Sequence, residues 1–280
     1  MRLIEVIHDA LNDEDRYQDD DERCHEHLRR LADNLSSMCR LFGYVAFEEK
    51  SPREMVGADL DGFIELSGIH KDGWGISRIE NNHATVTKAA EEARSSGDFR
   101  LALEGRSSGS LIHIRWATPG LGIDDSNAHP FIYGEYSFIH NGSIQPYDAL
   151  ASHIDPELLK LRQGSTDSEL LFLFILTHIN RLGVVEGVIS AIKEIKSSFT
   201  YSSINSMFLS KDYLIVISEN NPSNRPAWAD DEYYKLRYRK DENGIVVASS
   251  GWNQDSWIDI PQSSVLICDR KTLAISSHAL

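Results

Sequence analysis

The sequence has few cysteines, little positive charge and no long apolar run, and each shortage excludes a class of protein. Three cysteines, Cys24, Cys39 and Cys268, are too few for a disulfide framework. Lysines and arginines number 28 against 43 aspartates and glutamates, and the net charge of -15 disfavours nucleic acid and anionic membranes as partners. No apolar run could span a bilayer, and the first residues do not have the character of a signal peptide, so we expect a cytoplasmic protein without a membrane partner.

The first 38 residues differ in character from the rest of the chain. Seven carboxylates crowd residues 13–22, and apolar residues at helical spacing follow between Leu28 and Leu35. Strand-like apolar runs begin only after Cys39, and no linker interrupts the chain beyond that point. We therefore predict a leader over residues 1–38 and one domain over residues 39–280.

The apolar periodicity of the domain predicts strands, then two helices, then strands again. Helices are expected over residues 168–180 and 184–196. Strands are expected over residues 41–47, 74–79, 84–87, 111–116, 131–139 (as a pair), 206–209, 214–218, 233–239, 245–249, 265–268 and 272–276. This order of elements predicts sheets with helices packed outside them.

Four short segments carry the polar residues that amide hydrolysis requires. The first is Met38-Cys39-Arg40-Leu41-Phe42-Gly43, the second is His113-Ile114-Arg115-Trp116-Ala117-Thr118 followed by Asn127-Ala128-His129-Pro130-Phe131, the third is Ile139-His140-Asn141-Gly142-Ser143-Ile144, and the fourth is Ser165-Thr166-Asp167-Ser168-Glu169. The reaction needs a nucleophile, a base, an oxyanion site and groups that hold the substrate. Each segment offers at least one of these.

Cys39 is the candidate nucleophile, because an amino-terminal cysteine also supplies a base. A free α-amine has a pKa of about 7.7–8.0 and exchanges protons close to neutral pH. None of the eleven histidines stands in a recognisable triad motif. Since Cys39 lies inside the chain as written, residues 1–38 must be absent from the active form. Either synthesis begins at Met38 and that methionine is removed, which the junction favours, or residues 1–38 are a propeptide.

The other polar residues fit an oxyanion site and a clamp for a free amino-acid end. The Asn141 side chain and the Gly142 N–H can point at one oxygen. Arg115 suits an α-carboxylate, which a guanidinium binds through two parallel hydrogen bonds, and Asp167 suits an α-ammonium. Each residue also has an ordinary structural alternative. Asn141-Gly142 is a common turn sequence, Arg115 could form an ion pair, and Asp167 could cap a helix, although the preceding hydroxyl residues would cap equally well.

Taken together and in this order, the four segments resemble those of class II glutamine amidotransferases, which are N-terminal-nucleophile hydrolases. The resemblance covers residues 39 to about 250 and implies an α+β fold, a four-layer αββα sandwich. It also implies that Thr118 and the backbone near Trp116 help to hold the glutamyl end of the substrate. The chain is similar to the stand-alone members, among them γ-glutamyl amidases, but it has Ala248-Ser249-Ser250-Gly251-Trp252 where these often carry a Ser-Glu-Pro-Leu-like stretch. The pocket for the leaving group is therefore undefined.

The expected function is hydrolysis of the γ-amide of glutamine or a γ-glutamyl conjugate through a γ-glutamyl thioester on Cys39. Two alternatives stay open: a catalytically silent glutamyl-binding or regulatory subunit, and a glutaminase subunit that delivers ammonia to a separate synthase. We expect a small-molecule substrate, no nucleic acid, and no metal or other cofactor. A homodimer and a separate ammonia-accepting enzyme are the open partner assignments.

Overall fold

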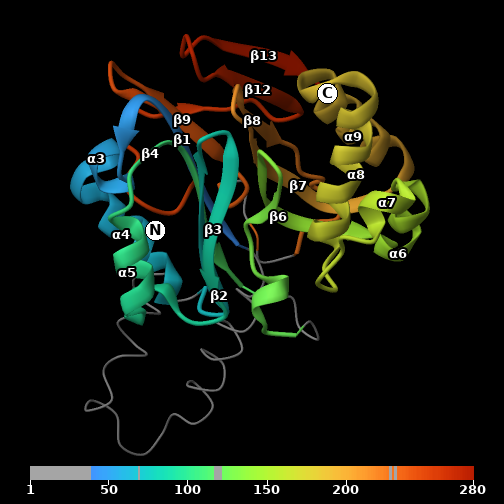
Figure 1. Ribbon diagram of the computed structural model, residues 1–280, viewed down its shortest axis with the longest axis horizontal. Coiled ribbons are helices and arrows are strands. Elements are labelled where there is room, and N and C mark those ends of the chain that lie inside the picture. Colours follow the sequence, from blue (N-terminus) through green and yellow to red (C-terminus); the bar gives the residue numbers. More distant parts are fainter. Residues whose placement is uncertain (1–38, 69, 117–121, 227–228, 230–231) are drawn as a thin grey trace, which may run out of the picture.

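The computed structural model describes residues 39–68, 70–116, 122–226, 229 and 232–280. These residues form two antiparallel sheets with helices on their outer faces (Figure 1). The first sheet has seven strands in the order β11-β9-β10-β1-β4-β2-β3, and the second has six in the order β13-β12-β8-β7-β6-β5. Among the described residues, no helix is long and apolar enough to cross a bilayer.

The strands alternate between the two sheets in blocks along the chain. The first sheet contains β1 (Arg40–Lys50), β2 (Gly73–Glu80), β3 (His83–Ala89), β4 (Ser107–Arg115), β9 (Leu236–Lys240), β10 (Gly244–Ser249) and β11 (Ile258–Asp259). The second contains β5 (Phe131–Tyr133), β6 (Tyr136–Gln145), β7 (Thr200–Leu209), β8 (Tyr213–Ser218), β12 (Ser264–Asp269) and β13 (Ile275–Ala279). The helices are α3 (Pro52–Val56), α4 (Leu60–Glu65), α5 (Gly97–Leu103), α6 (Tyr147–Leu150), α7 (Pro156–Leu159), α8 (Asp167–Leu182) and α9 (Val184–Ser198).

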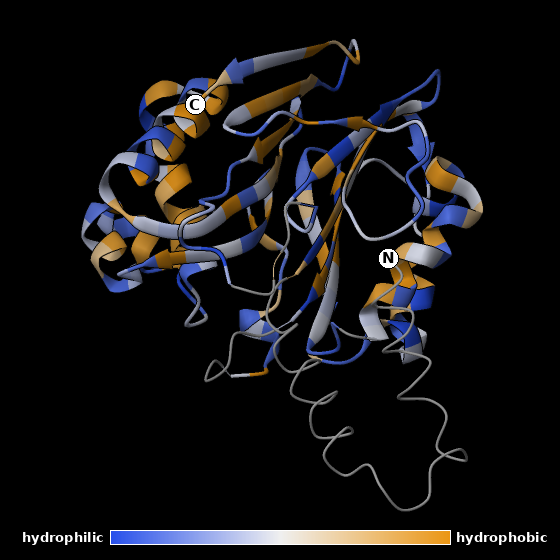
Figure 2. Cartoon of the chain, turned by 180° about the vertical axis from the view of Figure 1, so that it is seen from behind, coloured by the Kyte–Doolittle hydropathy of each residue, from blue (hydrophilic) through white to orange (hydrophobic). Residues whose placement is uncertain are grey.

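Strand β1 shows how one sequence fills two layers of the core. Successive side chains of a strand point to opposite faces, so Leu41 and Val45 pack between the two sheets. Phe42 and Tyr44 point the other way and pack under α3, α4 and α5. Figure 2 shows the result, with apolar residues along the strands of both sheets and on the helices that cover them.

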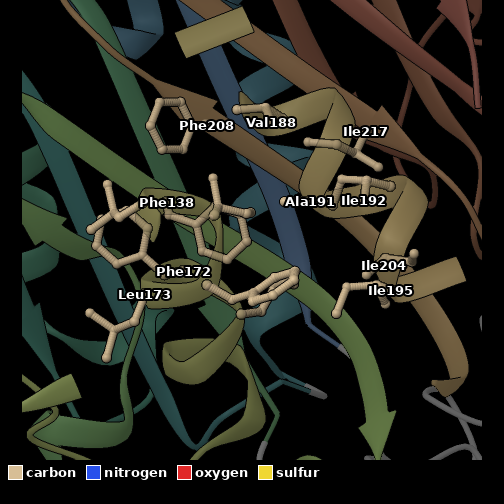
Figure 3. Packing of buried hydrophobic residues seen from close by; sticks show 14 of the residues in the cluster. Phe138, Phe172, Leu173, Val188, Ala191, Ile192, Ile195, Ile204, Phe208 and Ile217 are labelled. Carbon is tan, nitrogen blue, oxygen red and sulfur yellow. The ribbon is translucent and has the colours of Figure 1, made fainter. Parts of the chain in front are cut away.

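Helices α8 and α9 form the fourth layer, on the outer face of the second sheet (Figure 1). Phe172 of α8 stacks on Phe138 of β6, with ring centroids 5.6 Å apart and planes within 6° of parallel. Val188 and Ile192 of α9 join the same cluster (Figure 3). The four-layer αββα sandwich expected from the sequence is confirmed.

Several element boundaries differ from those expected. The hairpin at Asn81-Asn82 is confirmed, and both residues have positive φ. Strand β9 begins at Leu236, three residues later than expected, and β13 spans Ile275–Ala279 rather than residues 272–276. The sequence did not predict α3, α4 and α5, because helices of five to seven residues show too few turns for an apolar period to emerge.

Replacing Phe172 by alanine should lower the free energy of unfolding by about 3–5 kcal/mol, because the ring leaves a cavity between α8 and the second sheet. Leu182→Ala, at the 53 % exposed end of the same helix, is the control and should change it by no more than about 0.5 kcal/mol. Urea unfolding followed by circular dichroism measures both values. Equal losses would contradict the packing of α8.

Candidate active site

Cys39 lies directly before β1, at one end of the sandwich, and contacts both sheets. Its backbone N–H donates to Oδ1 of Asn141 in the facing sheet, at 3.2 Å. Its Sγ donates to the carbonyl oxygen of Trp116, the residue after β4, at 3.7 Å. The indole of Trp116 lies edge-on to the His70 ring, with centroids 5.3 Å apart. The candidate nucleophile is therefore held where the first sheet meets β6.

Asn141 and Gly142 lie inside β6, so they do not form the turn that the sequence left open as an alternative. The strand continues to Gln145, with a shift of register after Ser143. Gly142 has a φ of 154°, and a Cβ there would lie 1.9 Å from the carbonyl oxygen of Ser203 on β7. The neighbouring strand thus requires glycine at this position, whatever a substrate requires. Because Oδ1 of Asn141 accepts from Cys39, its side-chain NH₂ points elsewhere, and no described residue accepts from it.

Arg115 is the last residue of β4, and its side chain is almost wholly buried at 3 % exposure. One guanidinium nitrogen, Nη2, donates to the Gly122 carbonyl at 3.2 Å, whereas Nη1 has no partner among the described residues. The ordinary ion pair that the sequence left open is therefore not formed within the described part of the chain. A buried guanidinium with a free N–H group is suited to bind a carboxylate.

Asp167 is the first residue of α8, and the cap of that helix is the preceding residue. The hydroxyl of Thr166 accepts from the Glu169 N–H at 3.2 Å, so Asp167 does not serve as the cap. It is not wholly free either, because Oδ2 accepts from the Ile144 N–H at 2.8 Å and Oδ1 accepts from the Ser168 hydroxyl at 3.4 Å. The bond to Oδ2 connects the first residue of α8 to Ile144 of β6, which is three residues after Asn141. Thr118 and the leader over residues 1–38 lie outside the described residues.

The thiol of Cys39 is a poor nucleophile unless a base removes its proton. Burial raises the pKa of Cys39 to about 11. The hydrogen bond to Trp116 and the charges of Arg115 and Arg40 lower it in part, while the charge of Asp167 raises it further. The sulfur is therefore protonated at neutral pH.

The nearby histidines do not supply that base, because they bond to the core. His140 Nδ1 lies 2.9 Å from the Ser168 hydroxyl, and its Nε2 lies 3.2 Å from the Ser203 carbonyl oxygen. His113 Nε2 lies 3.3 Å from the His140 carbonyl oxygen, and burial lowers the pKa of His113 to about 3. Both are therefore buried core residues. His129, whose ring stacks on that of His113 at 4.2 Å, belongs to the same buried group.

One residue of this region received no role from the sequence. Arg40, beside the nucleophile, is 6 % exposed, and its Nε and Nη1 have no partner among the described residues. Its guanidinium lies over the Tyr233 ring, 4.2 Å from the centroid. The available signal was a charged residue directly before the apolar run over residues 41–47.

Comparison with known proteins gives the class. The family model for class II glutamine amidotransferases matches residues 38–275, and the chain belongs to this family. A protein of Saccharomyces cerevisiae described as probable glutamine amidotransferase DUG3 is 38% identical over 171 residues, 52% of this chain and 47% of that protein. The glutamine–fructose-6-phosphate aminotransferase of Aquifex aeolicus is 28% identical over 169 residues, 60% of this chain and 27% of that protein. The chain thus matches less than half the length of either relative.

Solved structures support the fold. A class II glutamine aminotransferase domain protein from Silicibacter pomeroyi superposes with a TM-score of 0.62 at 18% identity, covering 86% of this chain and 99% of that one. Glutamine phosphoribosylpyrophosphate amidotransferase from B. subtilis superposes with a TM-score of 0.58 at 17% identity, covering 86% of this chain and 49% of that one. At this identity the likeness concerns the fold alone.

The buried histidines should make the fold sensitive to acid. Burial lowers the pKa of His129 well below 6.5, so the unfolded chain binds a proton near pH 6.5 that the folded chain does not. The stability that the neutral, buried His129 contributes is therefore present above pH 6.5 and is lost as the pH falls. When the pH is lowered from 7.5 to 5, the free energy of unfolding should fall for both proteins. The fall should be about 1–2 kcal/mol smaller for His129→Phe than for the wild type.

Urea unfolding at the two pH values measures this difference. His83→Phe, at an exposed position on β3, is the control and should follow the wild type. Identical pH slopes for the wild type and His129→Phe would contradict a neutral, buried His129.

Proposed function

We propose that the chain hydrolyses the γ-amide of glutamine or of a γ-glutamyl conjugate through a γ-glutamyl thioester on Cys39. The observation that carries the proposal is the hydrogen bond from the Cys39 nitrogen to Asn141 Oδ1. This bond supports the proposal because it joins Cys39, which we propose as the nucleophile, directly to Asn141, which we propose as an oxyanion donor. The family implies a glutamine-type substrate, which agrees with this arrangement.

The base in this proposal is the α-amine of Cys39. With a thiol pKa of about 11, the sulfur needs a proton acceptor close by, and an α-amine with a pKa of about 7.7–8.0 can accept and return the proton at neutral pH. A peptide nitrogen cannot do so. The active form therefore begins at Cys39, either because synthesis starts at Met38 and this methionine is removed, or because residues 1–38 are cleaved as a propeptide.

The substrate would be held by its free amino-acid end. Arg115 binds the α-carboxylate through the N–H group that lacks a partner, and Asp167 binds the α-ammonium through the oxygen that faces away from Ile144. Trp116 and Thr118 complete the same subsite, as the family resemblance implies. A glutamine inside a peptide would lack both charged groups and would be rejected.

The reaction then proceeds in two halves. The amine takes the thiol proton, the sulfur attacks the γ-carbonyl carbon, and the oxyanion accepts hydrogen bonds from the Asn141 side chain and the Gly142 N–H. Loss of one such donor costs roughly 3–4 kcal/mol in the barrier. The ammonium gives its proton to the leaving nitrogen, and ammonia or an amine departs. Water attacks the thioester, the amine accepts its proton, and glutamate is released as the thiol re-forms.

Replacing Cys39 by alanine should abolish glutamate release from every γ-glutamyl substrate, because the thioester cannot form. Cys268→Ala is the matched control: Cys268 is buried between the sheets on β12, far along the chain, and its variant should keep wild-type turnover. Glutamate release is measured with and without hydroxylamine, which should divert the thioester of active protein to γ-glutamyl hydroxamate.

Turnover by Cys39→Ala near the wild-type rate would refute the nucleophile. Glutamine binding by wild-type protein in calorimetry, with no glutamate released by any form of the chain, would favour the silent glutamyl-binding subunit. Glutaminase turnover that rises only when a synthase is added would favour an ammonia-delivering subunit.

A further inference from the structure

Arg40 carries a buried positive charge that no described carboxylate neutralises. Its side chain is 6 % exposed, and Nε and Nη1 have no hydrogen-bond partner among the described residues. The Tyr233 ring under the guanidinium, at 4.2 Å, stabilises the cation but accepts neither N–H group in its plane. Burying a charge without a partner is costly, so an arginine in this state is suited to a negatively charged ligand.

The position of Arg40 relates it to Cys39 rather than to the core. Its charge lowers the pKa of the Cys39 thiol, so the guanidinium lies within electrostatic range of the sulfur. The charges of Arg40 and Cys39 also both act on the Tyr233 hydroxyl. Arg40 directly follows Cys39 in the chain and its guanidinium lies over the Tyr233 ring, so the three residues lie close together at this end of the sandwich.

The sheet order places this region opposite the proposed glutamyl subsite. Strand β1 lies between β4, which ends in Arg115, and β10, which leads into Gly251. Gly251 lies against the Arg40 guanidinium, and Tyr233 precedes β9, the next strand beyond β10. A leaving group that extends from Cys39 on the side away from Arg115 and β4 would come towards β10 and Arg40.

We propose that Arg40 binds a carboxylate on the leaving side of the scissile amide, which makes γ-glutamyl peptides with a free terminal carboxylate the preferred substrates over glutamine. This inference rests on the proposed function and assigns its substrate class. Arginine suits the role because its guanidinium is always charged and carries five N–H donors. Two of its three nitrogens, Nε and Nη1, have no hydrogen-bond partner among the described residues.

The test compares two substrates that differ only in that carboxylate, γ-glutamyl-glycine and γ-glutamyl-glycinamide. The active form should show a higher kcat/KM for the acid, and Arg40→Gln should reduce the acid-to-amide ratio about 10- to 100-fold, the range expected for a hydrogen bond to a charged group. Arg40→Lys, which keeps the charge and loses the planar guanidinium, should retain part of the ratio.

Arg239→Gln is the matched control, because Arg239 on β9 also lies over an aromatic ring, that of Trp257 at 5.7 Å. It should leave the acid-to-amide ratio at the wild-type value. The melting temperature of Arg40→Gln should be equal to or higher than that of the wild type, since the variant removes an unpaired buried charge. An unchanged ratio in Arg40→Gln, or a ratio lowered equally in Arg239→Gln, would overturn the proposal.

A binding measurement separates this inference from the proposed function. In a Cys39→Ala background the substrate stays intact, and calorimetry should show tighter binding of γ-glutamyl-glycine than of its amide, with the difference lost on adding Arg40→Gln. Preference without turnover in any form of the chain would sustain the carboxylate site and refute the hydrolase. Turnover without an acid preference would sustain the hydrolase and refute the carboxylate site.

Discussion

The hydrogen bond between the Cys39 nitrogen and Asn141 Oδ1 joins the residue before β1 of the first sheet to the middle of β6 in the second. It forms because the two sheets face each other, with Leu41 of β1 and Ile139 of β6 packed in the core between them. It also fixes the orientation of the Asn141 amide, so that the NH₂ group is left for another acceptor. The fold thus determines which atoms of the candidate site are available for chemistry.

Two buried arginines give this region its electrostatic character. Arg115 on β4 and Arg40 on β1 each retain an N–H group without a described partner, and both charges act on the Cys39 thiol. In an ordinary core such groups would be paired, because an unpaired buried charge destabilises the fold. A small substrate with negative groups at both ends would satisfy the two arginines at once. If the protein acts as proposed, the binding of the substrate offsets the loss of stability that the two unpaired charges cause.

The order of strands and helices could be predicted from the sequence, but several local contacts of the candidate site could not. Long apolar periods revealed α8, and the paired asparagines between β2 and β3 revealed that hairpin, because local composition decides both. That the Asn141-Gly142 pair lies inside a strand could not be predicted, because its glycine is required by the Ser203 carbonyl on β7, 61 residues later in the sequence. The tie from Asp167 to Ile144 and the missing partner of Arg40 also depend on tertiary neighbours. Contacts of this kind produce no periodic pattern in the sequence.

The central claim is that the base is the freed nitrogen of Cys39, and the most direct test is the amino-terminal mass of the active species. Native protein is separated chromatographically, and each fraction is measured by intact mass spectrometry and for glutamate release from glutamine. The account predicts that activity follows the species that begins at Cys39 and is absent from the species that retains Met1. Full activity in a fraction whose chains all keep Met1 would contradict it.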